Sequence, residues 1–142
     1  MVADIRRLPF GANSIDRVYL NDVVEHVSDL IALMEEIWRV CKPNARVHIR
    51  VVNWDSQYMA IDPTHCRPIH PETFSFFGGR PGRDYYTHAR FEVLSLVKGY
   101  DHRLSRWTLG SRKWLDFLAH YLHNVLIDLN FTLRAIKEPT HV

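Results

Sequence analysis

The chain has 142 residues, of which 46% are hydrophobic and 24% charged, with a formal net charge of +2. This length suits one domain with a real core and is too short for two. No apolar run reaches the ~18 residues of a membrane span, and Arg6 and Arg7 lead into Leu-Pro-Phe rather than into a secretory leader. Cys41 and Cys66 form neither a CxxC pair nor a disulfide framework. We therefore expect one domain in the reducing cytoplasm.

Positive charge is concentrated in the middle of the chain. Residues 80–113 carry eight Lys and Arg against three Asp and Glu, whereas residues 1–79 carry eight against ten. Aromatic residues such as Trp107 and Trp114 accompany this basic segment. It could attract nucleic acid or an anionic substrate, but no RNA- or DNA-binding motif accompanies it. A substrate cap or a solvated face is the simpler interpretation.

The first predicted elements are a loop and a strand. Pro9 and Gly11 mark the loop, and the apolar run over residues 16–21 is typical of a buried parallel strand. Asn21 and Asp22 stand where that strand should end. In open α/β sheets ligands bind beyond the carboxyl ends of the strands, so both residues are candidates for a site.

A helix and a second strand follow. Ser28 or Asp29 is expected to cap the helix, and Pro43 with Asn44 ends it. Apolar residues recur at helical spacing at Leu30, Leu33, Met34, Ile37 and Cys41, with Glu35, Glu36 and Arg39 on the outer face. Apolar and polar side chains alternate over residues 45–52, which is typical of a strand with one buried face. This β-α-β unit predicts two parallel strands with a right-handed crossover.

The remaining chain is less regular. Residues 53–90 read as a long loop with a short helix from Pro71. A strand is predicted over 91–101 and a final strand over 130–137. Between them, apolar residues on most sides of residues 111–126 predict a helix that packs on the sheet.

Four motifs in this order resemble the later half of a class I S-adenosylmethionine-dependent methyltransferase, of the small-molecule type 11 kind. They are Asp4-Ile5-x-x-Leu8-Pro9-Phe10, Ser14-Ile15-Asp16-Arg17-Val18, Glu25-His26-Val27-x-Asp29 and Glu36-x-x-Arg39-Val40-x-Lys42-Pro43. The likeness covers roughly residues 2–52. Beyond it, Asp62-Pro63-Thr64-His65 and Pro71-Glu72-Thr73-Phe74 are similar to a loop and a helix of some members.

The resemblance implies a partial Rossmann-like α/β fold: a mostly parallel sheet with flanking helices. Its four strands would correspond to strands 4, 5, 7 and 6 of the family, side by side in that order. Residues 1–142 would form one incomplete domain. Its parts would be a cofactor-side β-α-β unit over 1–52, a substrate-side loop over 53–90 and a C-terminal strand-helix-strand over 91–142.

The resemblance also implies a site for S-adenosylmethionine. Asp4 would accept the exocyclic amine of adenine, with Ile5 beside the ring, since a carboxylate can only accept. Asn21 and Asp22 would line the pocket near the sulfonium. His26 would pack over the cofactor, orient the loop or act as a general base. For Asp4 the alternative is the start of a turn, and for His26 it is a purely structural hydrogen bond.

The departures from the family are equally specific. The family holds its cofactor with a Gly-rich loop after the first strand and an acidic residue after the second, and this chain shows neither. Its one glycine cluster, Gly78-Gly79-Arg80-Pro81-Gly82, contains Pro and opens no helix. We therefore expect the chain to correspond to a methyltransferase from the end of its third strand onward. A missing N-terminal segment or self-association would then cover the bare edge of strand 16–21.

The predicted activity is methyl transfer to a small-molecule acceptor by in-line attack on the sulfonium methyl, with no particular base required. One alternative is a non-catalytic remnant or subunit, and another is a nucleic-acid-binding module that uses residues 80–113. No metal site is predicted, because His65, Cys66 and His70 lack the paired spacing of a zinc motif.

Overall fold

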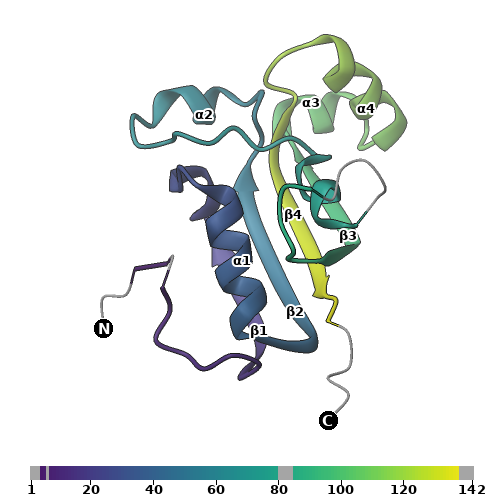
Figure 1. Ribbon diagram of the computed structural model, residues 1–142. Helices are drawn as coiled ribbons and strands as arrows, with labels where there is room; N and C mark the ends of the chain where they lie inside the picture. Colours follow the sequence, from purple (N-terminus) through teal and green to yellow (C-terminus); the bar gives the residue numbers. More distant parts are fainter. Residues whose placement is uncertain (1–3, 6, 80–84, 138–142) are drawn as a thin grey trace.

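A computed structural model describes residues 4–5, 7–79 and 85–137. A four-stranded sheet forms its centre and α1 lies across one face, while α2 on one side and α3 with α4 on the other lie beyond one end of the strands (Figure 1). The elements are β1 (Ile15–Asn21), the 3₁₀ turn η1 (Val24–His26), α1 (Leu30–Val40), β2 (Cys41–Val52), α2 (Gln57–Ile61), the 3₁₀ turn η2 (Thr73–Phe77), β3 (Phe91–Tyr100), α3 (His102–Trp107), α4 (Arg112–Tyr121) and β4 (Leu126–Ala135). Residues 80–82 of the glycine cluster and Arg83 of the basic segment lie outside the described residues.

The strand order is β1-β2-β4-β3, which is the order that the family resemblance implies. β1 pairs with β2 in parallel, whereas β4 is antiparallel to both β2 and β3. The sheet is therefore mixed, and the expected mostly parallel pairing is wrong in this detail. The reason is that α3 and α4 join the end of β3 to the start of β4 at the same end of the sheet (Figure 1). The chain therefore reverses its direction without crossing the sheet.

One face of the sheet carries the core and the other is polar. Core-facing side chains of β2 lie opposite core-facing side chains of β4, in the pairs Val47–Leu133, Ile49–Phe131 and Val51–Leu129. On the opposite face the pairs are Arg46–Arg134, His48–Thr132 and Arg50–Asn130. An alternation of this kind is typical of a sheet with one face covered. Phe74 of η2 packs edge-on against Phe131 at 4.7 Å between ring centroids, so η2 helps α1 to cover the core face.

The α1 helix forms as its sequence predicts. The carboxylate of Asp29 accepts a hydrogen bond from the backbone N–H of Ala32 at 2.9 Å, so Asp29 is the N-cap. Leu33, Met34 and Ile37 are buried against the sheet. The helix ends at Val40, before the predicted stop at Pro43 and Asn44; Asn44 lies near the start of β2 with a φ of +64°, a conformation that asparagine tolerates well. β2 begins at Cys41, four residues earlier than predicted.

The C-terminal half differs more from prediction. The helix expected over 111–126 ends at Tyr121, and β4 covers 126–135 rather than 130–137. Asn124 has a φ of +60° and accepts a hydrogen bond from the N–H of Gln57 at 3.0 Å, which turns the chain into β4. Leu115 is the only buried residue of α4, so this helix packs on the sheet over a smaller face than predicted. Ala119 packs against the core, and Asp116 bonds to Lys98 and Tyr100 of β3.

The segment over 53–90 contains more structure than predicted. The short helix expected from Pro71 is present as η2, and its Phe74 and Phe77 are buried. The α2 helix was not predicted; Ser56 caps it by accepting from the N–H of Tyr58 at 3.3 Å. Within the described ranges, no helix is long and apolar enough to cross a membrane.

Candidate site at the exit of β1

The strand exit of β1 holds Asn21 and Asp22, as predicted from the sequence. Both residues are exposed. Asp22 has a φ of +53°, and its N–H donates to the carbonyl of Arg50 at 3.0 Å. Its carboxylate lies 3.5 Å from the guanidinium of Arg50, which also lies 3.6 Å from Asp128. The parallel register therefore places a cation beside Asp22, a partner that the sequence motif alone did not suggest.

Glu25 of η1 forms hydrogen bonds to the end of β2 and to the loop after α2. Its side chain is fully buried, and one carboxylate oxygen accepts from the N–H of Val52 at 3.3 Å. Its backbone carbonyl accepts from the N–H groups of Cys66 and Arg67 at 2.9 and 3.0 Å. The end of β2 and the loop after α2 are thus fixed against η1.

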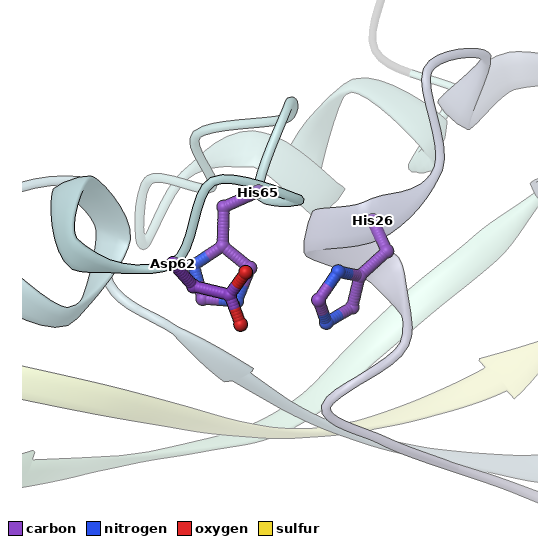
Figure 2. Close-up of side chains that lie close together, drawn as sticks. All are labelled: His26, Asp62 and His65. Atoms are coloured by element: carbon purple, nitrogen blue, oxygen red, sulfur yellow. The ribbon is translucent and has the colours of Figure 1, made fainter.

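His26 does not stand alone, because the loop after α2 brings Asp62 and His65 beside it (Figure 2). The rings of His26 and His65 lie 4.7 Å apart at 60°. Thr64 links the group: its hydroxyl donates to Asp62 at 2.6 Å and lies 2.9 Å from Nδ1 of His26. Hydrogen bonds from the Thr64 hydroxyl and N–H hold the pKa of Asp62 below its usual value. The side chain is therefore a carboxylate at neutral pH.

Sequence reasoning missed this group. It weighed His65 with Cys66 and His70, which are near it in sequence, whereas the structure pairs it with His26 and Asp62. The available signal was the Asp62-Pro63-Thr64-His65 motif, whose residues are those that assemble beside His26.

Asp4 and Ile5 lie on a separate segment that leads into the first loop. Asp4 is exposed, and its carbonyl accepts from the N–H of Arg7 at 2.9 Å, so it does begin a turn. Ile5 is half-buried and packs against the core. Their contact with adenine stays a prediction, as do the cofactor roles of Asn21, Asp22 and His26.

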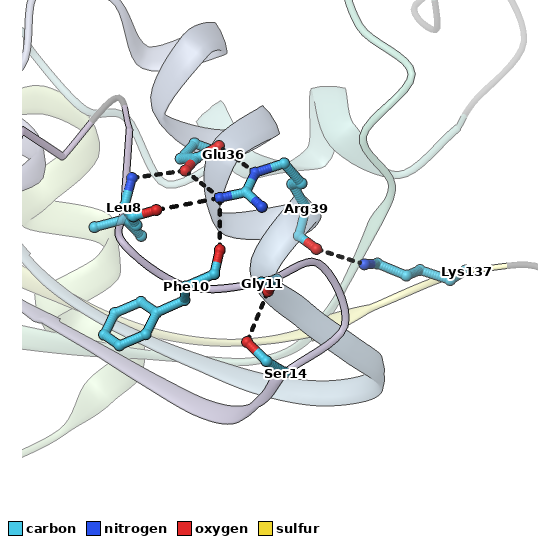
Figure 3. A network of polar contacts seen from close by, with 7 residues as sticks. All are labelled: Leu8, Phe10, Gly11, Ser14, Glu36, Arg39 and Lys137. Atoms are coloured by element: carbon cyan, nitrogen blue, oxygen red, sulfur yellow. Dashed lines mark hydrogen bonds and ion pairs between the residues drawn. The ribbon is translucent and has the colours of Figure 1, made fainter.

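The Leu-Pro-Phe loop is clamped to α1 by Glu36 and Arg39 (Figure 3). Glu36 accepts from the N–H of Leu8 at 2.7 Å and forms a bidentate pair with Arg39, both contacts at 2.7 Å. Arg39 also donates to the carbonyls of Leu8 and Phe10 at 3.3 and 3.0 Å. The hydrogen bond from Arg39 lowers the pKa of Glu36. Two residues expected on the outer face of the helix thus position the loop after Asp4 and Ile5.

The larger cavities lie away from the β1 exit. One of about 620 Å³ is beside Trp38, Arg39 and Lys137, and another of about 480 Å³ lies between η2 and β3. Neither is lined by Asn21, Asp22 or His26. A cavity of about 290 Å³ lies at the start of α1, between Asp29, Arg67 and the aromatic residues Phe76, Phe77 and Tyr86.

Comparison with known proteins gives one family match and several matches of fold. Residues 1–49 match the family model for a type 11 methyltransferase domain. A search of curated proteins finds no match. Among solved structures, a SAM-dependent methyltransferase from Archaeoglobus fulgidus aligns with a TM-score of 0.61 at 20% identity, over 94% of this chain and 66% of that one.

Two further structures agree on the fold. A SAM-dependent methyltransferase from Methanosarcina mazei aligns with a TM-score of 0.61 at 15% identity, over 97% of this chain and 67% of that one. The cyclase SpnF aligns with a TM-score of 0.60 at 16% identity, over 97% of this chain and 57% of that one. The chain thus spans about two thirds or less of the length of these structures. It has the fold of these S-adenosylmethionine-dependent methyltransferases, and its residues 1–49 match the model of the type 11 methyltransferase domain.

Proposed function

We propose that the chain forms part of an S-adenosylmethionine-dependent methyltransferase that acts on a small molecule. The observation that carries the proposal is the type 11 match over residues 1–49 on a sheet of order β1-β2-β4-β3. Because a fold hosts many activities, and SpnF is named a cyclase, the proposal depends on the residues at the β1 exit.

These residues fit part of the cofactor. Asp4 presents an exposed carboxylate that suits an exocyclic amine, and Asn21 offers both a donor and an acceptor. When bound, S-adenosylmethionine supplies an electrophilic methyl group. The part of this chain is to hold the acceptor in line with that group, and such positioning supplies much of the barrier reduction without a dedicated base. His26, exposed beside Asn21 and Asp22, would orient the acceptor side of the pocket.

The 290 Å³ cavity is the proposed acceptor pocket. Its apolar wall is formed by Ile31, Phe76 and Phe77, and Arg67 supplies a cation. The guanidinium of Arg67 is held by a hydrogen bond to the carbonyl of Ser28. A fixed guanidinium beside a cavity suits a ligand oxygen that carries negative charge. The acceptor that fits best is a small apolar molecule with an anionic or carbonyl oxygen.

The test is an NMR titration of the ¹⁵N-labelled chain with S-adenosylmethionine, because weak binding is expected from a partial site. Backbone amides at residues 4–5 and 21–26 should shift together. Asp4→Asn should weaken the response to adenosine, and Asp16→Asn is the matched control, since Asp16 is an exposed carboxylate near the start of β1. Unperturbed amides at both segments would overturn the proposal. Submicromolar binding would show instead that residues 1–142 form a complete site.

Two alternatives make different predictions. A non-catalytic remnant would show no response at residues 4–5 and 21–26. A nucleic-acid module would bind DNA or RNA in a salt-dependent way through the exposed cations of α3 and α4, Arg103, Arg106, Arg112 and Lys113. We expect no such binding, because no RNA- or DNA-binding motif accompanies these cations. Another cation of the segment, Lys98 of β3, is already bonded to Asp116 at 2.6 Å.

The edge of β1 is the proposed partner surface. Within the described residues β1 pairs only with β2, so its other edge is unpaired. An unpaired edge favours addition of another strand. Either a segment outside residues 1–142 or a second copy of the chain would supply that strand. Light scattering after gel filtration distinguishes them, since only the second produces a concentration-dependent dimer.

A further inference from the structure

We propose that His26, Asp62 and His65 bind one divalent transition-metal ion of the zinc type. This site goes beyond methyl transfer and does not depend on it. The three side chains come from η1 and from the loop after α2, which are far apart in sequence (Figure 2). Because the ligands are far apart in sequence, they form no spacing motif from which a metal site could be predicted.

The ligand set and its geometry fit such an ion. Two imidazoles and one carboxylate form a common three-ligand set for zinc and iron in proteins. One ligand atom from each side chain lies within 4.8 Å of the other two, and Nε2 of His65 lies 3.7 Å from Oδ2 of Asp62. Ligands about 2.1 Å from a tetrahedral ion are about 3.4 Å apart. The exposed ring of His26 can close the remaining difference.

The hydrogen bonds around the group leave the coordinating atoms available. Nδ1 of His65 lies 3.1 Å from the carbonyl of Tyr58, which can only accept, so Nδ1 carries a proton and, in the neutral ring, Nε2 carries the lone pair. The one hydrogen of the Thr64 hydroxyl goes to Oδ1 of Asp62, so the hydroxyl oxygen of Thr64 accepts a hydrogen bond from Nδ1 of His26. In the neutral ring, Nε2 of His26 then carries the lone pair. In this neutral form, both histidines donate a hydrogen bond through Nδ1 and present Nε2 to the metal. Metal-binding histidines are commonly oriented by such a second hydrogen bond.

The hydrogen bonds to Asp62 also leave one of its carboxylate oxygens available. Oδ1 of Asp62 accepts from the N–H and the hydroxyl of Thr64 at 2.8 and 2.6 Å, which leaves Oδ2 for an ion. The bonds from Cys66 and Arg67 to the carbonyl of Glu25 join the two ligand-bearing segments. Ligands held by such supporting contacts lose little entropy on binding.

Three protein ligands leave at least one coordination position open. A structural zinc site is usually closed by four protein ligands, whereas a site with three keeps a position for water or for an oxygen of a bound molecule. Asp62 and His65 are half-buried and His26 is exposed, so solvent reaches the site. The site would therefore take an exchangeable oxygen ligand.

The experiment is calorimetric titration of the chelator-treated chain with zinc chloride alone, repeated with Co²⁺ followed by visible absorption. One ion should bind per chain. His26→Gln and Asp62→Asn should each weaken binding by about ten-fold or more, and Thr64→Val should weaken it by about ten-fold while keeping all three ligands. His123→Gln is the matched control, because His123 faces a carboxylate, Asp55, with no third ligand beside it among the described residues.

Circular dichroism would verify that each variant is folded, and His26→Gln is the safest since the side chain is exposed. Binding that is lost in the His26 and Asp62 variants and kept in His123→Gln would support the site. Absence of saturable binding would overturn the proposal. Binding that is unchanged by His26→Gln, or equally weakened by His123→Gln, would also overturn it by assigning the ion to other surface histidines.

Discussion

Two helices of nearly equal length, α1 and α4, both carry an amphipathic sequence but occupy different environments. α1 buries five of its side chains in the core, whereas α4 buries only Leu115. The aromatic residues Trp114, Phe117 and Tyr121 of α4 are 54–68% exposed. An apolar stripe therefore predicted both helices but not what each would contact.

The difference follows from how the strands are connected. α1 joins the parallel strands β1 and β2, so the chain must cross the face of the sheet to start the second strand. α3 and α4 join the antiparallel strands β3 and β4, whose connected ends lie at the same end of the sheet. No crossing is needed there, and α4 stays at that end (Figure 1). Strand direction and the more apolar sequence of α1 both favour its place in the core.

The largest effect should come from truncating equivalent apolar residues in the two helices. Ile37→Ala in α1 should lower the free energy of unfolding by about 2–5 kcal/mol, because it leaves a cavity in the core. Phe117→Ala in α4 should change it by less than about 0.5 kcal/mol. Urea denaturation measures both. Equal losses would show that α4 packs on the sheet in solution through Phe117 as well.

A smaller loss of stability is expected when the ion-paired carboxylate of each helix, Glu36 in α1 and Asp116 in α4, is replaced by an amide. The pKa of Glu36 is lowered by Arg39, so its stabilising contribution is present at neutral pH, above its ordinary pKa of 4.5, and is lost as pH falls through the lowered value. Glu36→Gln should lower the free energy of unfolding by roughly 1–2 kcal/mol at pH 7. The variant should also lose less stability than the wild type as the pH falls.

Asp116 in α4 is the matched comparison. Its pKa is lowered chiefly by Lys98, but its side chain is 48% exposed, so solvent screens the pair. Asp116→Asn should therefore produce a smaller change than Glu36→Gln. Thermal unfolding followed between pH 3 and 7 compares the two; the reverse ranking would contradict the assigned role of the Glu36–Arg39 clamp.

The smallest effect concerns the helix caps. Asp29→Ala should destabilise the chain by about 1 kcal/mol, since it removes the acceptor for the N–H of Ala32. Ser111 precedes α4 without a side-chain cap bond, so Ser111→Ala should be close to neutral. Hydrogen exchange of the first-turn amides would reveal the change in α1 and its absence in α4.

Much of the fold could be predicted, because the β-α-β unit has clear periodicity and the family motifs imply the strand order. The end of α4 could not. Leu122, Val125 and Leu126 continue a helical spacing, yet the last two are buried at the start of the sheet region. Spacing alone cannot separate a short apolar strand from another helical turn. The turn at Asn124 depends on Gln57, which is distant in sequence.

The site shows the same limit. Asn21, Asp22 and His26 follow one strand, so their shared location could be predicted from local sequence. The partners of Asp22 and His26 could not, because Arg50 arrives through the parallel register and Asp62 and His65 through a long loop. Long-range pairing of this kind leaves no local pattern in one sequence.

The position of β4 has a consequence for synthesis. β4 lies between β2 and β3, yet it is the last strand of the four in the chain. β3 has no strand to pair with until residues 126–135 are made, which at about 5–20 residues per second leaves it unpaired for roughly 2–7 seconds on the ribosome. During that time the apolar side chains of Phe91 and Leu96 are open to other chains. Slow translation between β3 and β4 should therefore lower the yield of folded protein more than slow translation between β1 and β2.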